Sequence, residues 1–320
     1  MDYRQLRSIS GRGLGADSFS AELRGLHIDK SDRLWAVGDR AVKLFDAQGK
    51  AIGHWKTGSD PTCITTDAQG VLLVGQAGGY TRYDDNGKLL GTFRDAERLG
   101  RVTCIGFTGQ DVLVADATHR CIRRYDKDGR FLNAIGANNN THGFLIPNGH
   151  LEFAMDAEGT IHAANPGKYR IERYTPAGKL LGHFGRFGTK KPEDFPGCCN
   201  PTNMTLMPDG RVVVTEKAPP RMKVYDAKGK MLAVVTPEAF DANCRNMDVA
   251  VDSLGRIYVA DTVRLRILVF TSDAAAQSRP ETEQSRDRKG ADENLNTTPL
   301  PHGRGSVRPV PDNREGEPRS

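Results

Sequence analysis

The apolar and polar residues of this chain alternate with a period of two in many short runs, and polar turns separate the runs. In the run from Val42 to Phe45, for example, Val42 and Leu44 face the same side of an extended chain. Helical repeats would show a period of 3.6 instead. Asp-Gly and Asn-Gly pairs follow several runs and supply the positive φ angle that tight hairpin turns need. The pattern predicts an all-β protein.

One larger pattern recurs six times along the chain: a turn, an apolar strand, a variable loop, a second strand that ends in an aromatic residue, and a polar turn. The aromatic residues are Phe45, Tyr83, Tyr125, Tyr174, Tyr225 and Phe270, which lie 38, 42, 49, 51 and 45 residues apart. Four strands with their turns need roughly 40–50 residues. We therefore expect a six-bladed β-propeller of four-stranded blades.

The two ends of the chain differ in what they can form. The sixth copy stops at Phe270 without the outermost strand that follows each earlier aromatic residue, and residues 3–9 are expected to supply it. The propeller is then expected to span residues 1–271. Residues 272–320 contain no aromatic residue and only four Leu and Val residues. This apolar surface is too small to offset the entropy of ordering the segment, so we expect a disordered C-terminal tail.

A known repeat resembles the sixth copy. The segment DSLGRIYVADT at residues 252–262, followed by RILVF at residues 266–270, resembles an NHL repeat. The resemblance extends over residues 20–271 and implies a six-bladed propeller, but no single function, since such propellers include protein-binding, RNA-binding and sensor modules and some metalloenzymes. The segment FPGCCNPTN at residues 195–203 resembles an uncharacterised group of bacterial NHL-repeat proteins with a Gly-Cys-Cys-Asn-Pro motif.

Composition limits the choice of partners and compartment. The formal net charge of +5 is spread over many short loops, without the Lys/Arg runs and interleaved aromatics of a nucleic-acid groove, which argues against nucleic-acid binding. No run of 18 apolar residues could span a bilayer. Six scattered cysteines are too few for a disulfide framework, which favours a reducing compartment. As written, the chain starts without a signal peptide, so we expect a cytoplasmic monomer, or an exported one if the natural start lies upstream of Met1.

Alignment of the copies identifies one position at the start of each innermost strand. This position holds Cys63, Cys104, Glu152, Asn203 and Asp248. We expect these side chains to ring the central channel. Cys199 and Cys244 align with each other four positions earlier, in loops at one mouth of the channel.

Such side chains could together bind a metal. Thiolates favour zinc or iron, and carboxylates or amides favour calcium. The candidate metal-ligating residues are Cys199, Cys244, Glu152 and Asp248. The alternative is that small residues pack where six strands crowd together, with cysteine acting as a small hydrophobe. The sequence identifies no cofactor and leaves a bound metal as an open question.

Two long loops, residues 136–150 and 185–201, lead into innermost strands and should lie on the same face, which we call the loop-rich face. Loops of this length carry binding more often than scaffolding. The ends of the second strands should reach the same face. The candidate ligand-binding residues are Cys198, Cys199, Asn200, Asn203, His142, His150, Glu216, Lys217, Asn165 and Asp261.

Two hypotheses about function follow. The first is a binding module that recognises a protein or a small-molecule ligand through the loop-rich face. The alternative is a metal-dependent hydrolase or lyase with its site at the mouth of the central channel. The chain contains no G-x-S-x-G, Walker A or H-E-x-x-H motif, so no catalytic residue is identified and the question of enzymatic activity stays open.

Overall fold

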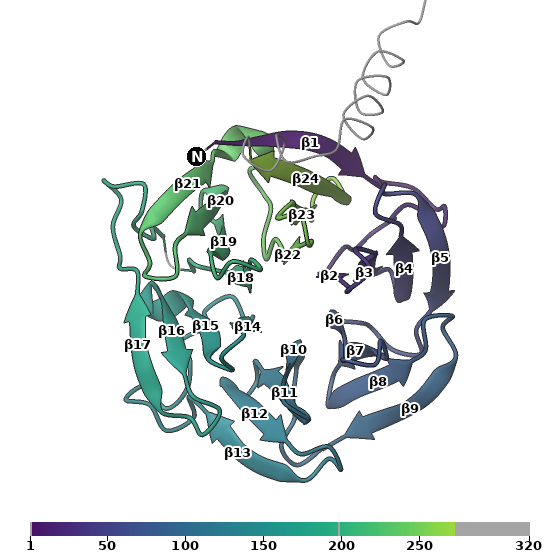
Figure 1. Cartoon of the computed structure of the whole chain (residues 1–320), viewed down its shortest axis with the longest axis horizontal. Helices are drawn as coiled ribbons and strands as arrows, with labels where there is room; N and C mark the ends of the chain where they lie inside the picture. Colours follow the sequence, from purple (N-terminus) through teal and green to yellow (C-terminus); the bar gives the residue numbers. More distant parts are fainter. Residues whose placement is uncertain (1, 198, 273–320) are drawn as a thin grey trace, which may run out of the picture. The chain divides into compact units, whose positions relative to one another are not determined.

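A computed structural model describes residues 2–197 and 199–272. Within them, 24 strands form six four-stranded antiparallel sheets that stand around a central channel (Figure 1). The predicted six-bladed propeller is confirmed. The predicted disordered tail lies outside the described residues, except for Ser272, which ends the last strand one residue beyond the expected boundary.

The first five blades each run from an innermost to an outermost strand in chain order. Blade 1 contains β2 (Gly25–Ile28), β3 (Leu34–Gly38), β4 (Ala41–Phe45) and β5 (Ala51–Lys56). Blade 2 contains β6 (Cys63–Thr66), β7 (Leu72–Gln76), β8 (Gly79–Tyr83) and β9 (Leu89–Arg94). Blade 3 contains β10 (Val102–Thr108), β11 (Asp111–Asp116), β12 (Cys121–Tyr125) and β13 (Phe131–Ile135).

Blades 4 and 5 each carry a short 3₁₀ turn besides their strands. Blade 4 contains β14 (Phe153–Met155), β15 (Ile161–Asn165), η1 (Pro166–Lys168), β16 (Arg170–Tyr174) and β17 (Leu180–Phe184). Blade 5 contains β18 (Asn203–Leu206), β19 (Val212–Lys217), β20 (Pro220–Tyr225) and β21 (Met231–Val235), followed by η2 (Pro237–Ala239). No helix in the described part of the chain is both long and apolar enough to cross a membrane.

Blade 6 joins the two ends of the propeller. It contains β22 (Val249–Val251), β23 (Ile257–Asp261) and β24 (Arg266–Ser272), and its outermost strand is β1 (Tyr3–Ile9). β1 pairs antiparallel with β24, from Tyr3 opposite Ser272 to Ile9 opposite Ile267 (Figure 1). Each innermost strand contacts the next one around the channel, and β22 contacts β2. The first described strand thus supplies the strand that the sixth repeat lacks.

The alternation with a period of two sorts side chains between two cores. Trp35 and Val37 of β3 pack with residues of blade 2, whereas Leu34 and Ala36 pack with residues of blade 6, including Tyr258. All five residues of β3 are consequently buried. In the outermost strand β5, by contrast, half-buried and exposed residues alternate. The cores of this protein therefore lie between blades, because each inner strand has a neighbouring blade on both sides.

Aspartates organise the hairpin turns. Asp46 Oδ1 accepts hydrogen bonds from the backbone N–H of Gln48 at 3.0 Å and of Lys50 at 2.8 Å, while Gly49 between them adopts a φ of 85°. That conformation strains any residue with a Cβ atom. The same two bonds recur at Asp84, Asp126 and Asp226. The turn chemistry predicted from the Asp-Gly and Asn-Gly pairs is confirmed at Gly87, Gly129 and Gly210, which all have positive φ.

Deletion of residues 2–9 should lower the melting temperature by roughly 5 °C or more, because blade 6 would lose its outermost strand and expose the edge of β24. Differential scanning calorimetry measures this change. Gln5→Ala is the matched control, since the Gln5 side chain is exposed within the same strand and its removal should leave the melting temperature unchanged. A deletion variant that melts with the wild-type protein would contradict closure by β1.

Candidate functional site

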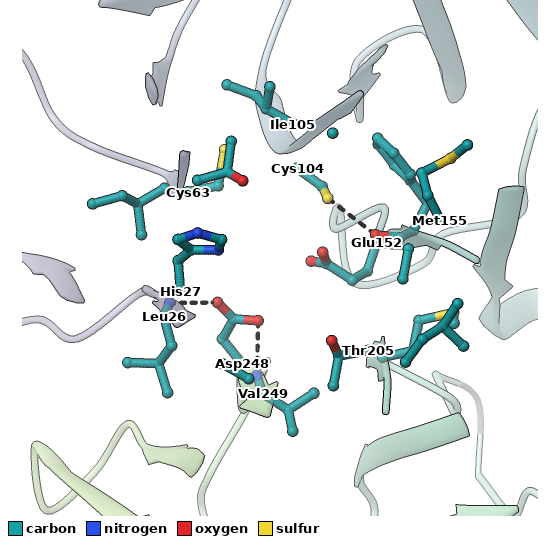
Figure 2. A pocket seen from close by; sticks show the side chains of 18 of the residues that line it. Leu26, His27, Cys63, Cys104, Ile105, Glu152, Met155, Thr205, Asp248 and Val249 are labelled. Carbon is teal, nitrogen blue, oxygen red and sulfur yellow. Dashed lines mark hydrogen bonds between the residues drawn. The ribbon is translucent and has the colours of Figure 1, made fainter. Parts of the chain in front are cut away.

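The innermost strands enclose a cavity of about 370 Å³ along the central channel. Side chains from all six blades line it. Four of the five aligned channel positions are among them: Cys63, Cys104, Glu152 and Asp248. Figure 2 shows the carboxylates of Glu152 and Asp248 extending into the space between His27 and Thr205. Sequence alignment thus identified four residues that line the central channel.

A buried hydrogen-bonded cluster occupies one end of this cavity. His150 Nε2 lies 2.9 Å from Glu152 Oε2 and 2.9 Å from Asn203 Nδ2. Asn203 Nδ2 also lies 3.5 Å from Glu152 Oε2 and 3.5 Å from Asp248 Oδ1. One amide therefore joins carboxylates from blades 4 and 6.

The cavity is closed at the cluster and opens at the opposite end. His150 is 8% exposed and Asn203 is 0% exposed, whereas β2, β6 and β18 all run from two buried to two half-buried residues. Above the cluster, Asn148 Nδ2 donates to Asn246 Oδ1 at 3.0 Å and joins the loops of blades 4 and 6. The expected mouth on the loop-rich face is thus covered by the loops. The opening lies at the turn face, where first and second strands are connected.

Burial controls the charge of Asp248. Desolvation, followed by the nearby charge of Glu152, raises the pKa of the Asp248 carboxyl to about 7. Two backbone N–H groups oppose this shift: Leu26 N–H donates to Oδ2 at 2.7 Å, and Val249 N–H donates to Oδ1 at 2.8 Å. The charge of His150 opposes it as well. The carboxyl therefore titrates near neutral pH.

The other titratable groups in the cavity are neutral near pH 7. Burial lowers the pKa of His27 to about 4. Burial also raises the pKa of the Cys63 and Cys104 thiols, and the charge of Glu152 raises both further. No Lys or Arg is among the lining residues that the structure describes. Glu152 and Asp248 are the only acidic residues among the lining residues that the structure describes.

The candidate metal ligands are not brought together. Cys244 Sγ lies 3.2 Å from Asp261 Oδ1 in its own blade, while Glu152 and Asp248 lie in the channel. Residues 2–197 and 199–272 contain no group of three or more His, Cys, Asp or Glu side chains that could hold a metal ion. Cys199 is buried, and Cys198 falls outside the described residues. The set Cys199, Cys244, Glu152 and Asp248 does not form a metal site in this structure.

Asn200 clamps the Gly-Cys-Cys-Asn-Pro segment to the strand beside it. Its Nδ2 donates to the carbonyl oxygens of Pro196 at 2.7 Å and Ala218 at 3.0 Å, and its Oδ1 accepts from Lys217 N–H at 2.9 Å. The side chain is fully buried. All of these bonds are to the protein's own backbone, so Asn200 positions the loop rather than facing a ligand.

Asn165 and Asp261 anchor other loops of the same face. Asn165 Oδ1 accepts a hydrogen bond from Leu145 N–H at 3.1 Å, which ties the long loop of blade 4 to β15. Asp261 Oδ1 accepts from Arg264 N–H at 2.9 Å, and its Oδ2 accepts from Arg266 Nε at 3.2 Å. Both side chains are 0% exposed. These two candidates therefore hold the loops of this face in place.

Glu216 belongs to a buried charge network. Its Oε2 accepts from Arg221 Nε at 2.6 Å, and its Oε1 lies 2.5 Å from Lys223 Nζ. Glu216 and Lys223 are both 0% exposed. Sequence reasoning missed Lys223, whose Nζ also donates to the Asp194 carbonyl at 2.6 Å and lies over the Phe195 ring. Glu216 is thus a structural residue of blade 5.

Sequence reasoning also missed His27 and Thr205, which line the cavity with Thr65. Each lies two residues after the start of its innermost strand, and residues two apart in a strand share a side. The period-two rule, applied to the aligned positions, could have identified them. Among the loop candidates, His142 is exposed and Lys217 is half-buried, so these two can reach a partner.

Comparison with known proteins confirms the repeat and the fold. Residues 248–270 match the family model of the NHL repeat. No curated protein sequence matches the chain. Virginiamycin B lyase from Staphylococcus aureus is similar in structure, with a TM-score of 0.58 and 11% identity over 85% of this chain and 100% of that chain.

Two other solved structures are similar to a comparable degree. The WD40 β-propeller domain of Doa1 has a TM-score of 0.59 and 13% identity over 85% of this chain and 98% of that chain. A luciferin-regenerating enzyme has a TM-score of 0.58 and 14% identity over 79% of this chain and 91% of that chain. Identities this low establish the propeller fold alone.

Glu216→Gln should lower the free energy of unfolding by about 3 kcal/mol, because it leaves the buried charges of Arg221 and Lys223 without their carboxylate. Urea unfolding measures the loss. Adding Lys223→Met to this variant should restore part of the stability. Glu238→Gln, at an exposed site, is the control, and equal stability of the two Glu→Gln variants would refute the buried network.

Asp248→Asn should change how stability depends on pH. The folded-state pKa of about 7 lies above the ordinary unfolded value of about 3.9, so the stability that the protonated carboxyl contributes is present below about pH 4 and is lost as the pH rises through about 7. The variant minus wild-type melting temperature should thus increase by several degrees between about pH 4 and about pH 8. The exposed control Asp60→Asn should give a constant difference. A constant difference for Asp248→Asn would disprove the raised pKa.

Proposed function

We propose that this NHL-repeat β-propeller is a binding module that recognises a partner protein through its loop-rich face. The observation that carries the proposal is the loop of residues 185–201. Its base is held by buried hydrogen bonds, yet it presents Phe187, Lys190 and Lys191 to solvent. A surface that is rigid before binding loses little conformational entropy when a partner docks.

The rigidity of this loop comes from Asp194 and its neighbours. Asp194 Oδ1 accepts from Arg186 Nε at 2.7 Å, and the Asp194 carbonyl accepts from the buried Lys223 Nζ at 2.6 Å. The next carbonyl, that of Glu193, accepts from Tyr225 OH at 3.1 Å. Lys223 and Tyr225 of blade 5 thus anchor the inner side of the loop. The outward-facing residues of the loop do not take part in these anchoring contacts.

The exposed side chains suit an acidic partner. Phe187 is 58% exposed, and its ring centroid lies 4.9 Å from that of Tyr169 on the adjacent turn of blade 4. Lys190 and Lys191 follow it and are exposed. Aromatic residues frequently dominate the binding energy of protein interfaces, and opposite charge at the rim speeds association. Leu14, at 95% exposure, adds a second apolar contact in the loop that precedes blade 1.

The alternative, a metal-dependent hydrolase or lyase, receives no support from the donor groups. Such an enzyme needs several ligands within about 2.0–2.5 Å of one ion. The described residues offer no group of three or more suitable side chains. The lyase named above is similar in fold only.

The variant Phe187→Asp/Lys190→Glu/Lys191→Glu should bind the partner protein with an affinity at least ~10-fold lower than wild type. It removes the aromatic contact and reverses the charge of the loop. Affinity capture with quantitative mass spectrometry, followed by titration of the captured protein, measures this loss. The matched control is Leu254→Asp/Lys228→Glu/Lys230→Glu, which changes exposed residues at turns outside the loop-rich face. The proposal would be refuted if both variants bound the captured protein with equal affinity. It would also be refuted if the wild-type protein and both variants showed no saturable binding of any captured protein.

A further inference from the structure

The central cavity has an unusual charge. Its lining includes two carboxylates, Glu152 and Asp248, and no Lys or Arg among the described residues. The chain as a whole has a formal net charge of +5, so the acidic lining of the cavity is opposite in sign to the net charge of the chain. Buried carboxylates are ordinarily paired with a cation. Glu152 lies 2.9 Å from His150 Nε2, whereas among the described residues Asp248 contacts two backbone N–H groups and the amide of Asn203.

The side-chain amide of Asn203 lies beside the two carboxylates. Asn203 is 0% exposed, and its Nδ2 lies 3.5 Å from both Glu152 Oε2 and Asp248 Oδ1. Its Oδ1 is buried without a hydrogen-bond partner among the residues that the structure describes. A primary ammonium group carries three N–H donors and a positive charge, which suits the carboxylates of Glu152 and Asp248 in the cavity lining.

The rest of the cavity is apolar. Its walls include Leu26, Ile64, Ile105, Phe153, Met204 and Val249. The volume of about 370 Å³ lies within the ~300–1,000 Å³ range of small-molecule sites. A hydrated inorganic ion would leave this surface without an apolar partner. An organic cation can contact both parts of the lining, because its ammonium group pairs with the carboxylates and its hydrocarbon body packs against the apolar walls.

We propose that the central cavity is a binding site for a small primary ammonium compound with an apolar body, which enters from the turn face and places its ammonium group between Glu152 and Asp248. This site is separate from the partner-binding loop-rich face, because the cluster of His150, Glu152 and Asn203 closes the channel between them. The protein would thus bind a metabolite-sized cation at one end of its axis and a protein at the other.

Isothermal titration of the full chain at about pH 8, where Asp248 is ionised, tests the site. The probes are cyclohexylammonium, cyclohexanol and cyclohexanecarboxylate, which share a ring and differ in charge. Cyclohexylammonium should bind at one site with a Kd of about 1 mM or lower. Cyclohexanol should bind at least ~10-fold more weakly, and cyclohexanecarboxylate should not bind. Neither compound supplies a positive charge to pair with Glu152 and Asp248.

Variants separate the site from the loop-rich face. Glu152→Gln/Asp248→Asn should weaken cyclohexylammonium binding at least ~10-fold, since it removes both charges and keeps the side-chain shapes. If this variant does not fold, Thr205→Phe, which narrows the cavity and leaves the carboxylates in place, should also weaken binding. Phe187→Asp/Lys190→Glu/Lys191→Glu should bind cyclohexylammonium as wild type does, so failure here is distinct from failure of partner binding.

Three results would overturn the proposal. Equal affinity for cyclohexylammonium and cyclohexanol would mean that the cavity is merely apolar. Unchanged binding in the double variant and in Thr205→Phe would place the cation elsewhere. Micromolar binding of Ca²⁺ or Zn²⁺, lost in the double variant and accompanied by no binding of cyclohexylammonium, would make the carboxylates a metal site instead.

Discussion

Closure of the ring forces six strands together at one axis. β1 completes blade 6 outside, and β22 contacts β2 inside, so the innermost strands have no room to spread. The junction between the last and first blades is bridged at the axis by Asp248 Oδ2, which accepts from Leu26 N–H at 2.7 Å. The same crowding brings Glu152 and Asn203 to Asp248 from two other blades. Ring closure therefore creates the desolvated acidic site.

The two ends of the axis have different chemistry because their connections differ in length. Short Asp-Gly-type turns at one end leave the channel open, and the inner strands become more exposed toward it. Long loops at the other end fold over the channel, where Asn148 and Asn246 join them. Buried side chains such as Asn200 and Glu216 hold these loops from within. The loop-rich face can thus present a fixed surface while the channel beneath it is sealed.

The fold could be predicted from the sequence because its determinants are local. The period of two, the spacing of Phe45 to Phe270 and the Asp-Gly-type turns each reflect one blade at a time. The site was only partly predictable. Alignment placed Glu152 and Asp248 in the channel, but the roles of Asn200 and Asn165 depend on hydrogen bonds with backbone groups distant in sequence. The role of Asp261 depends on bonds with its own turn and with Cys244, which no periodic pattern reveals. The buried pair of Glu216 with Lys223 could not be predicted either, because a lysine in a strand ordinarily points to solvent.

The central claim is that ring closure buries the Asp248 carboxyl at the axis, in a cavity whose described lining contains no Lys or Arg. An NMR titration of the Asp248 side-chain carboxyl carbon, assigned with Asp248→Asn, tests this claim most directly. The structure predicts that the carboxyl titrates with a pKa of about 7. A pKa near the ordinary value of about 3.9 would mean that the carboxyl is hydrated or paired with a cation, and would contradict the account.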